Sequence, residues 1–172
     1  MAWQQLPDPK AQWKLSTPYR VLSLLVFVTI NLSIPLVIEQ IVVIDYHWYE
    51  QLIKPAFTPP AWFFSQRVWI VLDILIALSG WLVCVEGRFH GVHALVYIVQ
   101  CVAHFAWMPV FFAARQLLLA LLDSVLQWFT LVCGVLMYRR INVWASLLLV
   151  PALMWVSLAA SFNAALWYLN QK

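Results

Sequence analysis

The sequence predicts an all-α integral membrane protein, a single bundle of five transmembrane helices. Of its 172 residues, 65% are hydrophobic and only 10% are charged, whereas a soluble domain carries about 25% charged residues. Five apolar runs reach the length of about 20 residues that spans a bilayer. Short turns separate the last four runs, so we expect these helices to be antiparallel neighbours. One membrane domain, residues 19–172, should follow a polar extension, residues 1–18.

The elements follow from where apolar runs and prolines occur along the chain. The first 18 residues are polar and contain three prolines, and the apolar run after them can span a membrane, so we predict a retained extension rather than a signal peptide. The connection 45–66 contains several prolines and cannot be helical throughout. A connection of this length is usually functional, and we predict a lid-like loop. The predicted helices are 21–44, 68–85, 92–114, 117–138 and 143–169.

Charged residues and cysteines exclude some classes of function. The net charge of +3 is spread along the chain without a basic run, which argues against nucleic acid as a partner. Lysines and arginines are slightly more frequent on the N-terminal side of the predicted bundle, which favours a cytoplasmic N-terminus. The three cysteines lie inside apolar runs without metal-ligand spacing, so we expect neither a metal site nor a disulfide framework.

Ionisable side chains within the predicted spans are the first candidates for function. Such residues are costly in a membrane and tend to face the interior of a bundle. Asp73, His104 and Asp123 lie in the second, third and fourth predicted helices. Each also has a structural interpretation. Asp123 lies near a helix N-terminus, where the helix dipole favours an anion; His104 could be a buried neutral imidazole, and Asp73 could pair with Arg67.

Tryptophan is abundant, with eleven residues. Trp48 and Trp128 are assigned to the interfacial aromatic belt. By contrast, Trp107 and Trp155 lie well inside predicted helices, where an indole N–H must find a partner. His104 and Trp107 are three residues apart and share a helix face. The pattern predicts an aromatic-lined pocket between the helices.

Three stretches resemble the TspO/MBR family of tryptophan-rich sensory proteins and translocator proteins. WYEQLIKPAFTPPAWFF (48–64) resembles the family's loop before the second helix. QCVAHFAWMPVFFAARQ (100–116) resembles its third helix, and LLVPALMWVSLAASFNAALWYLN (148–170) its fifth. The resemblance implies a five-helix membrane fold, commonly a homodimer. It also implies binding of porphyrins such as haem and protoporphyrin IX, or of sterols, between the helices under the first loop.

The site residues implied by the resemblance come from the loop and from three helices. The chain departs from the family pattern at several pocket positions, and two of them, Asp73 and His104, stand where the family has neutral hydrogen-bonding residues. An ionisable pocket is therefore expected, with His104 as a possible haem ligand. The predicted ligand-binding residues are Pro59, Trp62, Trp69, Asp73, His104, Trp107, Phe111, Trp155, Ala159, Phe162 and Asn163.

Three functions are compatible with these observations. The first is a sensor or carrier that binds a flat hydrophobic ligand, such as a porphyrin or sterol, and requires no cofactor. The second is a membrane enzyme for cyclisation, isomerisation or tetrapyrrole breakdown, with Asp73, His104 and Asp123 as acid–base groups. The third is a structural subunit of a membrane complex. The expected partners are the lipid bilayer, a hydrophobic small molecule and a second copy of the chain.

Overall fold

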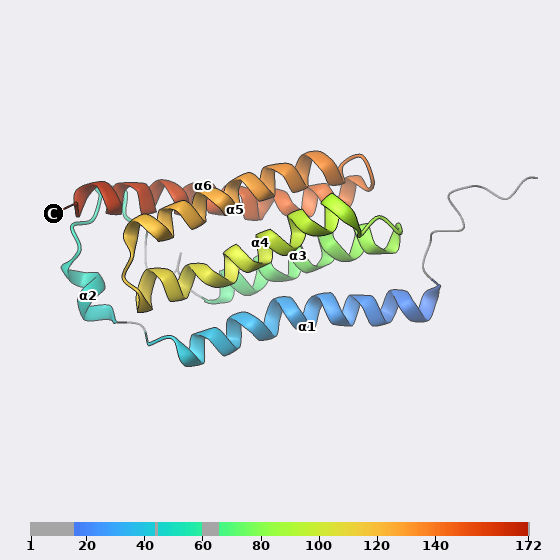
Figure 1. Ribbon diagram of the computed structural model, residues 1–172, viewed down its shortest axis with the longest axis horizontal. Coiled ribbons are helices and arrows are strands. Elements are labelled where there is room, and N and C mark those ends of the chain that lie inside the picture. Colours follow the sequence, from blue (N-terminus) through green and yellow to red (C-terminus); the bar gives the residue numbers. More distant parts are fainter. Residues whose placement is uncertain (1–15, 44, 60–65, 172) are drawn as a thin grey trace, which may run out of the picture.

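The computed structural model describes residues 16–43, 45–59 and 66–171, and these form an elongated bundle of helices (Figure 1). Five of the described spans are long and apolar enough to cross a membrane, which confirms the predicted fold class. Two shorter helices complete the described part of the chain, one in the first loop and one π-helix that continues a membrane span. The elements are α1 (Thr17–Ile41), α2 (Tyr46–Gln51), α3 (Gln66–Val85), α4 (Gly91–Met108), η3 (Pro109–Ala113), α5 (Leu117–Tyr138) and α6 (Val143–Leu169).

Prolines and capping side chains explain where helices begin and where an α-helix continues as a π-helix. α1 begins at Thr17, before the predicted start, with Pro18 in its first turn, where a missing N–H leaves no hydrogen bond unmade. The Asn142 side chain caps α6 by accepting from two backbone N–H groups. The predicted helix 92–114 is not a uniform α-helix. Pro109 has no N–H to donate, and the chain continues as the π-helix η3.

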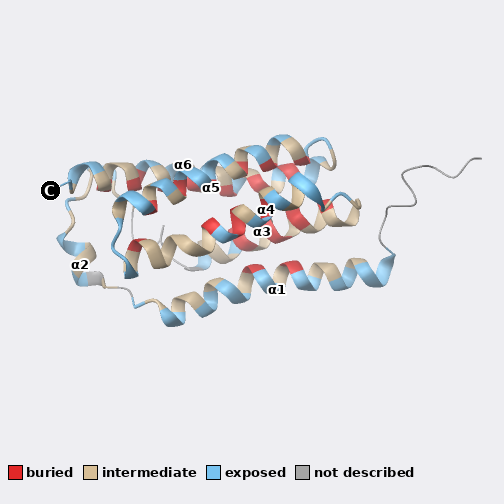
Figure 2. Cartoon of the chain, in the orientation of Figure 1, coloured by how far each residue is buried: buried red, intermediate tan, exposed pale blue. Residues whose placement is uncertain are grey.

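The principal helix contacts close a ring. They join α1 to α3, α3 to α6, α6 to α5, α5 to α4, and α4 back to α1. The expected adjacency of helices joined by short turns holds for α4 with α5 and for α5 with α6, whereas α3 and α4 approach each other less closely. α1 is the least buried span, with only Phe27 and Asn31 among its described residues fully enclosed. In Figure 2 the buried residues lie chiefly on the inner faces of the other helices.

Polar side chains tie the ring together where helices touch. Ser79 Oγ donates to the Ala145 carbonyl at 2.6 Å, linking α3 to α6. Asn31 Nδ2 donates to the Tyr97 hydroxyl at 2.7 Å, linking α1 to α4. In lipid, helix association depends on close packing and such interhelical hydrogen bonds rather than on the hydrophobic effect. The apolar side chains on the outer faces are therefore left to contact lipid.

Gly80 is required for the close approach of α1, α3 and α4. A Cβ at this position would lie 2.4 Å from Tyr97 Cε2 and 2.7 Å from Phe27 Cε1. We predict that Gly80→Ala destabilises the fold by about 1–3 kcal/mol, the usual effect of overpacking. Thermal unfolding of the purified protein in mild detergent measures the effect.

Gly134→Ala is the matched control. Its Cβ would lie 2.8 Å from the flexible end of Leu149 and at an ordinary contact distance of 3.9 Å from Tyr138 Cε2, and alanine gains up to about 1 kcal/mol in helix propensity. We expect a much smaller loss for this variant. Equal losses for the two variants would show that Gly80 has no special packing role.

Candidate functional site

The first loop covers one end of the ring. It contains the short helix α2, which contacts the helices below it. Asp45 caps α2 by accepting from the Trp48 backbone N–H at 2.9 Å. From α2, the Trp48 and Tyr49 rings contact Phe111 of η3, with centroid distances of 5.7 Å and 6.3 Å. Further along, Asn170 at the end of α6 both accepts from the Ile53 N–H and donates to the Ile53 carbonyl. The described loop is thus attached to both η3 and α6.

Arg115 and Asp45 form a second attachment of the loop, and we call this pair the loop latch. Arg115 Nη2 lies 2.6 Å from Asp45 Oδ2, and its guanidinium also lies over the Trp48 ring. Arg115 has φ 54°, a region that costs a residue with a side chain about 1–3 kcal/mol. The Trp48 backbone N–H, together with the Arg115 guanidinium, holds the pKa of Asp45 below its usual value. The latch therefore joins α2 to the turn between η3 and α5.

Beneath the loop lies an aromatic cluster. Trp107 stacks on Phe111 at a centroid distance of 5.0 Å and an interplanar angle of 17°. Phe111 itself is only 2% exposed and packs in a buried group with Ala120, Phe162 and Leu166. Phe111 belongs to η3, and π-helical turns are frequent at functional sites because they re-aim side chains. The cluster gathers side chains of α4, η3, α5 and α6 at one end of the bundle.

A polar centre lies deeper between α3, α4 and α6. His104 Nε2 on α4 is 2.8 Å from Asp73 Oδ1 on α3; the Asp73 side chain is buried, and the His104 side chain is 11% exposed. The Trp69 ring lies 5.2 Å from the His104 ring and 6.1 Å from the Trp155 ring. His104 is thirteen residues after Gly91, so it lies about 20 Å along α4. The polar centre therefore lies near mid-membrane, where ionisable groups are most costly.

Several buried polar atoms in this region still lack a hydrogen bond. Asp73 Oδ1 is one of them, although His104 Nε2 lies 2.8 Å away. Trp107 Nε1 and Asn163 Oδ1 are also unpaired, although Asn163 Nδ2 donates to Ser124 Oγ at 2.8 Å. Native proteins leave few buried polar groups unsatisfied, so each such group calls for an explanation. Together they offer two acceptors and one donor to a bound molecule.

Asp123 stands apart from the polar centre. Its Oδ2 accepts from Gln127 Nε2 at 2.7 Å on the same helix. It interacts electrostatically with His104, but the described residues contain no group of three histidine, cysteine or acidic side chains close enough to hold a metal ion. Of the three acid–base candidates, only Asp73 and His104 are in contact.

The structure distributes the predicted ligand-binding residues over these two groups. Ala159 is buried on α6, one turn from Trp155, and Pro59 lies at the end of the described loop. Trp62 lies outside the described residues. The polar centre contains Trp69, Asp73, His104 and Trp155, and the aromatic cluster contains or adjoins Trp107, Phe111, Phe162 and Asn163.

The sequence reasoning missed the residues that hold the loop. Trp48 packs on Phe111, a contact that its assignment to the interfacial belt does not predict. Arg115 forms the latch, a role that its place in the sequence does not indicate. An isolated acidic residue before Trp48 and a lone arginine ending the third helix were the available signals, but no sequence rule pairs residues seventy positions apart.

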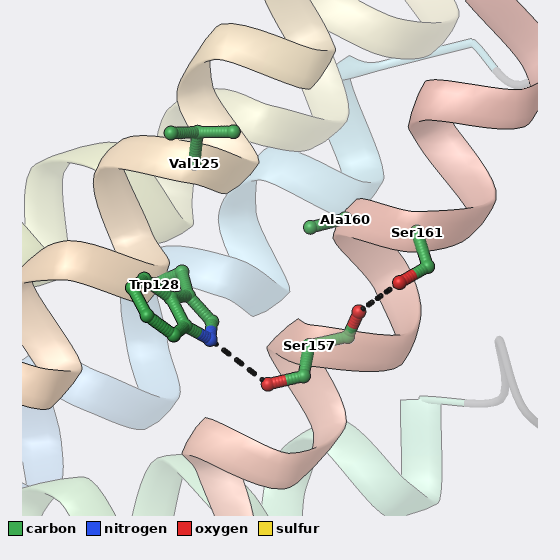
Figure 3. Close-up of a pocket in the computed structure, with 5 residues that line it drawn as sticks. All are labelled: Val125, Trp128, Ser157, Ala160 and Ser161. Carbon is green, nitrogen blue, oxygen red and sulfur yellow. Dashed lines mark hydrogen bonds between the residues drawn. The ribbon is translucent and has the colours of Figure 1, made fainter.

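The structure also contains a hollow that the sequence did not predict. Its volume is about 270 Å³, and it opens on the outer surface between α5 and α6 (Figure 3). Trp128 Nε1 donates to Ser157 Oγ at 3.0 Å in its wall. None of the predicted ligand-binding residues lines it. The lining residues are Val125, Trp128, Ser157, Ala160 and Ser161.

Fold and site together define a class. The chain is a multi-pass integral membrane protein in which five spans enclose an aromatic and polar interior, covered at one end by the first loop. Comparison with known proteins identifies the family. The TspO/MBR family model matches residues 22–169, so the chain belongs to this family.

Individual relatives agree with this assignment. The tryptophan-rich protein TspO of Chlorobaculum tepidum is 33% identical over 130 residues, covering 72% of this chain and 79% of the relative. The translocator protein of Sus scrofa is 32% identical over 129 residues, covering 73% and 76%. The tryptophan-rich sensory protein of Cereibacter sphaeroides is 31% identical over 124 residues, covering 72% and 77%.

The Asp73–His104 contact yields a stability prediction. Removing one partner of a buried pair leaves the other group uncompensated, at a cost of about 3–5 kcal/mol, whereas replacing both by apolar residues is often nearly neutral. We expect Asp73→Leu to destabilise strongly and the double variant Asp73→Leu/His104→Leu to recover most of the loss. Unfolding in detergent measures both. Additive losses would indicate that the two side chains are not coupled.

The loop latch yields a second prediction. Arg115→Gln should increase deuterium uptake in residues 45–59. The equilibrium constant for opening of the loop should rise by up to about fivefold, the range expected for loss of an exposed ion pair. Arg115→Lys, which keeps the charge, should have a smaller effect. Because the pKa of Asp45 is lowered in the folded protein, the difference from wild type should persist from pH 8 to pH 5. It should vanish only as the pH falls through that lowered pKa.

Proposed function

We propose that this protein is a membrane-embedded binding protein, a sensor or carrier, for a flat hydrophobic ligand such as a porphyrin or a sterol. The proposed site comprises the polar centre and the aromatic cluster under the first loop. The names of the relatives, translocator protein and tryptophan-rich sensory protein, agree with such a role. The observation that carries the proposal is the stack of Trp107 on Phe111 beside buried, unpaired polar atoms.

The physical reason is that the site combines aromatic faces with a few polar groups. Ligand pockets are typically apolar, with a small number of polar atoms that fix orientation. Indole and phenyl rings gain from offset or edge contacts with other π systems. The loop rests on this region through ring contacts, the latch and the Asn170 hydrogen bonds. Opening the loop would give a ligand access to the cluster.

A free-base porphyrin or another metal-free ligand fits the polar centre better than haem ligated by His104. His104 Nε2 faces Asp73 Oδ1 at 2.8 Å, so an iron atom could reach that nitrogen only if the contact broke. We therefore expect a haem Soret band, if one appears on addition of haem, to be insensitive to His104→Ala.

Catalysis is the second candidate, and the Asp73–His104 contact favours it. A carboxylate beside an imidazole can orient the ring for proton transfer. An enzyme would convert the bound ligand, and Asp73→Asn or His104→Ala would abolish conversion while leaving binding measurable. Mass spectrometry of the ligand recovered from the protein distinguishes the two functions. The homodimer implied by the family resemblance remains a prediction, and the mass of the protein in mild detergent tests it.

The proposed function predicts how tryptophan variants affect binding. Protoporphyrin IX should quench the fluorescence of the protein in nanodiscs at a stoichiometric ratio. Trp107→Leu should weaken binding roughly tenfold through loss of one stacked ring. The measurement is a fluorescence titration, with absorption spectra as a second readout.

Trp128→Phe is the control for this titration, because Trp128 lies on the outer surface and is 36% exposed. It should leave the dissociation constant unchanged. A protein that keeps its fold but shows no porphyrin response and carries no other flat ligand would contradict the proposed function.

A further inference from the structure

The charge balance of the interior is unusual for a site that takes an uncharged ligand. Asp73 and Asp123 supply two carboxylates, and among the described residues His104 is the only base beside them. The described arginines of the neighbouring spans, Arg20 and Arg67, lie in the first turns of their helices rather than in the interior. Even with a protonated imidazole, the three groups sum to one negative charge unless a further proton is bound.

A net negative charge between membrane helices requires compensation. Moving an unpaired carboxylate into a low-dielectric region is very costly. Gln127 donates a hydrogen bond to Asp123, and His104 contacts Asp73, but neither interaction supplies a second positive charge. A ligand that carried its own carboxylate would increase the imbalance, whereas a monocation would remove it.

The unpaired atoms point to the same ligand chemistry. Asp73 Oδ1 and Asn163 Oδ1 are buried acceptors without a hydrogen-bond donor, and their residues are 1% and 2% exposed. A protonated nitrogen is a charge-assisted donor and forms the stronger class of hydrogen bond with a carboxylate. The two unpaired acceptors call for N–H groups on the ligand, whereas the unpaired Trp107 Nε1 calls for one acceptor.

The aromatic side chains are also suited to a cation. The Trp69 ring lies beside His104 and Trp155, close to the Asp73 carboxylate that His104 contacts. The face of an indole attracts a cation, most strongly when both are removed from water. Here the π faces and the carboxylate occur together in one buried region.

We propose that the ligand carries one protonated nitrogen on its flat aromatic body, and that Asp73 is the group that receives it. This inference rests on the proposed function, since it concerns the same site. Among flat hydrophobic ligands it favours aromatic monocations over uncharged ligands such as sterols and over carboxylates such as protoporphyrin IX. Asp73 would then contact the cation and His104 together. Asp123 contributes to the negative potential from a distance.

Three probes that share one ring system test the proposal. At pH 7.5, 9-aminoacridine carries a positive charge, acridine is uncharged and acridine-9-carboxylate is negative. Each is titrated into the full-length protein in phosphatidylcholine nanodiscs, with empty nanodiscs as the blank and protoporphyrin IX as a reference ligand. We expect 9-aminoacridine to bind at least about tenfold more tightly than acridine, as desolvated charge pairs do, and the carboxylate to bind most weakly.

Variants at Asp73 test whether this residue causes the preference for the cationic probe. Asp73→Asn should bring the affinities of 9-aminoacridine and acridine together, while Asp73→Glu should keep them apart. Glu50→Gln makes the same carboxylate-to-amide change on the exposed surface of α2 and should leave the preference intact. If Asp73→Asn does not fold, the order of the three probe affinities in the wild-type protein and in Asp73→Glu still tests the cation preference.

The possible outcomes distinguish a failure of the cation preference from a failure of the proposed function. Equal affinities for the three probes, or tightest binding of the carboxylate, would overturn the cation preference and leave the proposed function standing. Binding of protoporphyrin IX without binding of any acridine would also overturn it. If a folded protein binds neither the acridines nor protoporphyrin IX, the proposed function itself fails.

Discussion

The absence of water in the hydrocarbon core is the constraint on which this structure depends. Backbone polar groups must be satisfied within each span, which leaves helices as the building unit. Side-chain polar groups must then find partners inside the ring. Ser79, Asn31 and Ser124 do so by bonding to neighbouring helices or to their side chains. Asp73 and His104 meet this demand only in part, and that partial satisfaction distinguishes the interior from a purely structural core.

The fold was largely predictable because hydropathy is a local property. Each span can be recognised from its own residues, and short turns limit the possible arrangements. The ring order was not predictable, since α3 and α4 are joined by a short turn, yet α3 packs chiefly on α1 and α6 and α4 packs chiefly on α5. The contact between Asp73 and His104 depends on that order. Two ionisable residues could be identified as candidates from sequence, but their pairing required the three-dimensional arrangement.

The candidate site was predicted more completely on the helices than in the loop. Trp107 and Phe111 lie within one helical span, so their common location follows from helical spacing. The loop residues follow no such period. Trp48 could belong to an interfacial belt, to a packed cluster or to both, and its contact with Phe111 is known only from the structure. The family pattern supplied the location of the site, whereas the departures at Asp73 and His104 supplied its chemistry.

The π-helix η3 has a consequence for how this segment tolerates changes in length. A wide turn accommodates one residue more than an α-helical turn of the same rise. Deleting a single residue between Pro109 and Ala113 would allow an α-helix to form there, and the side chains beyond it would keep roughly their present direction. A deletion between His104 and Pro109, in the regular α-helix, would instead rotate every side chain beyond it by about 100°. His104 would then keep its place while Arg115 would turn away from Asp45. The π-helix is therefore the part of this segment whose length can change without loss of either attachment.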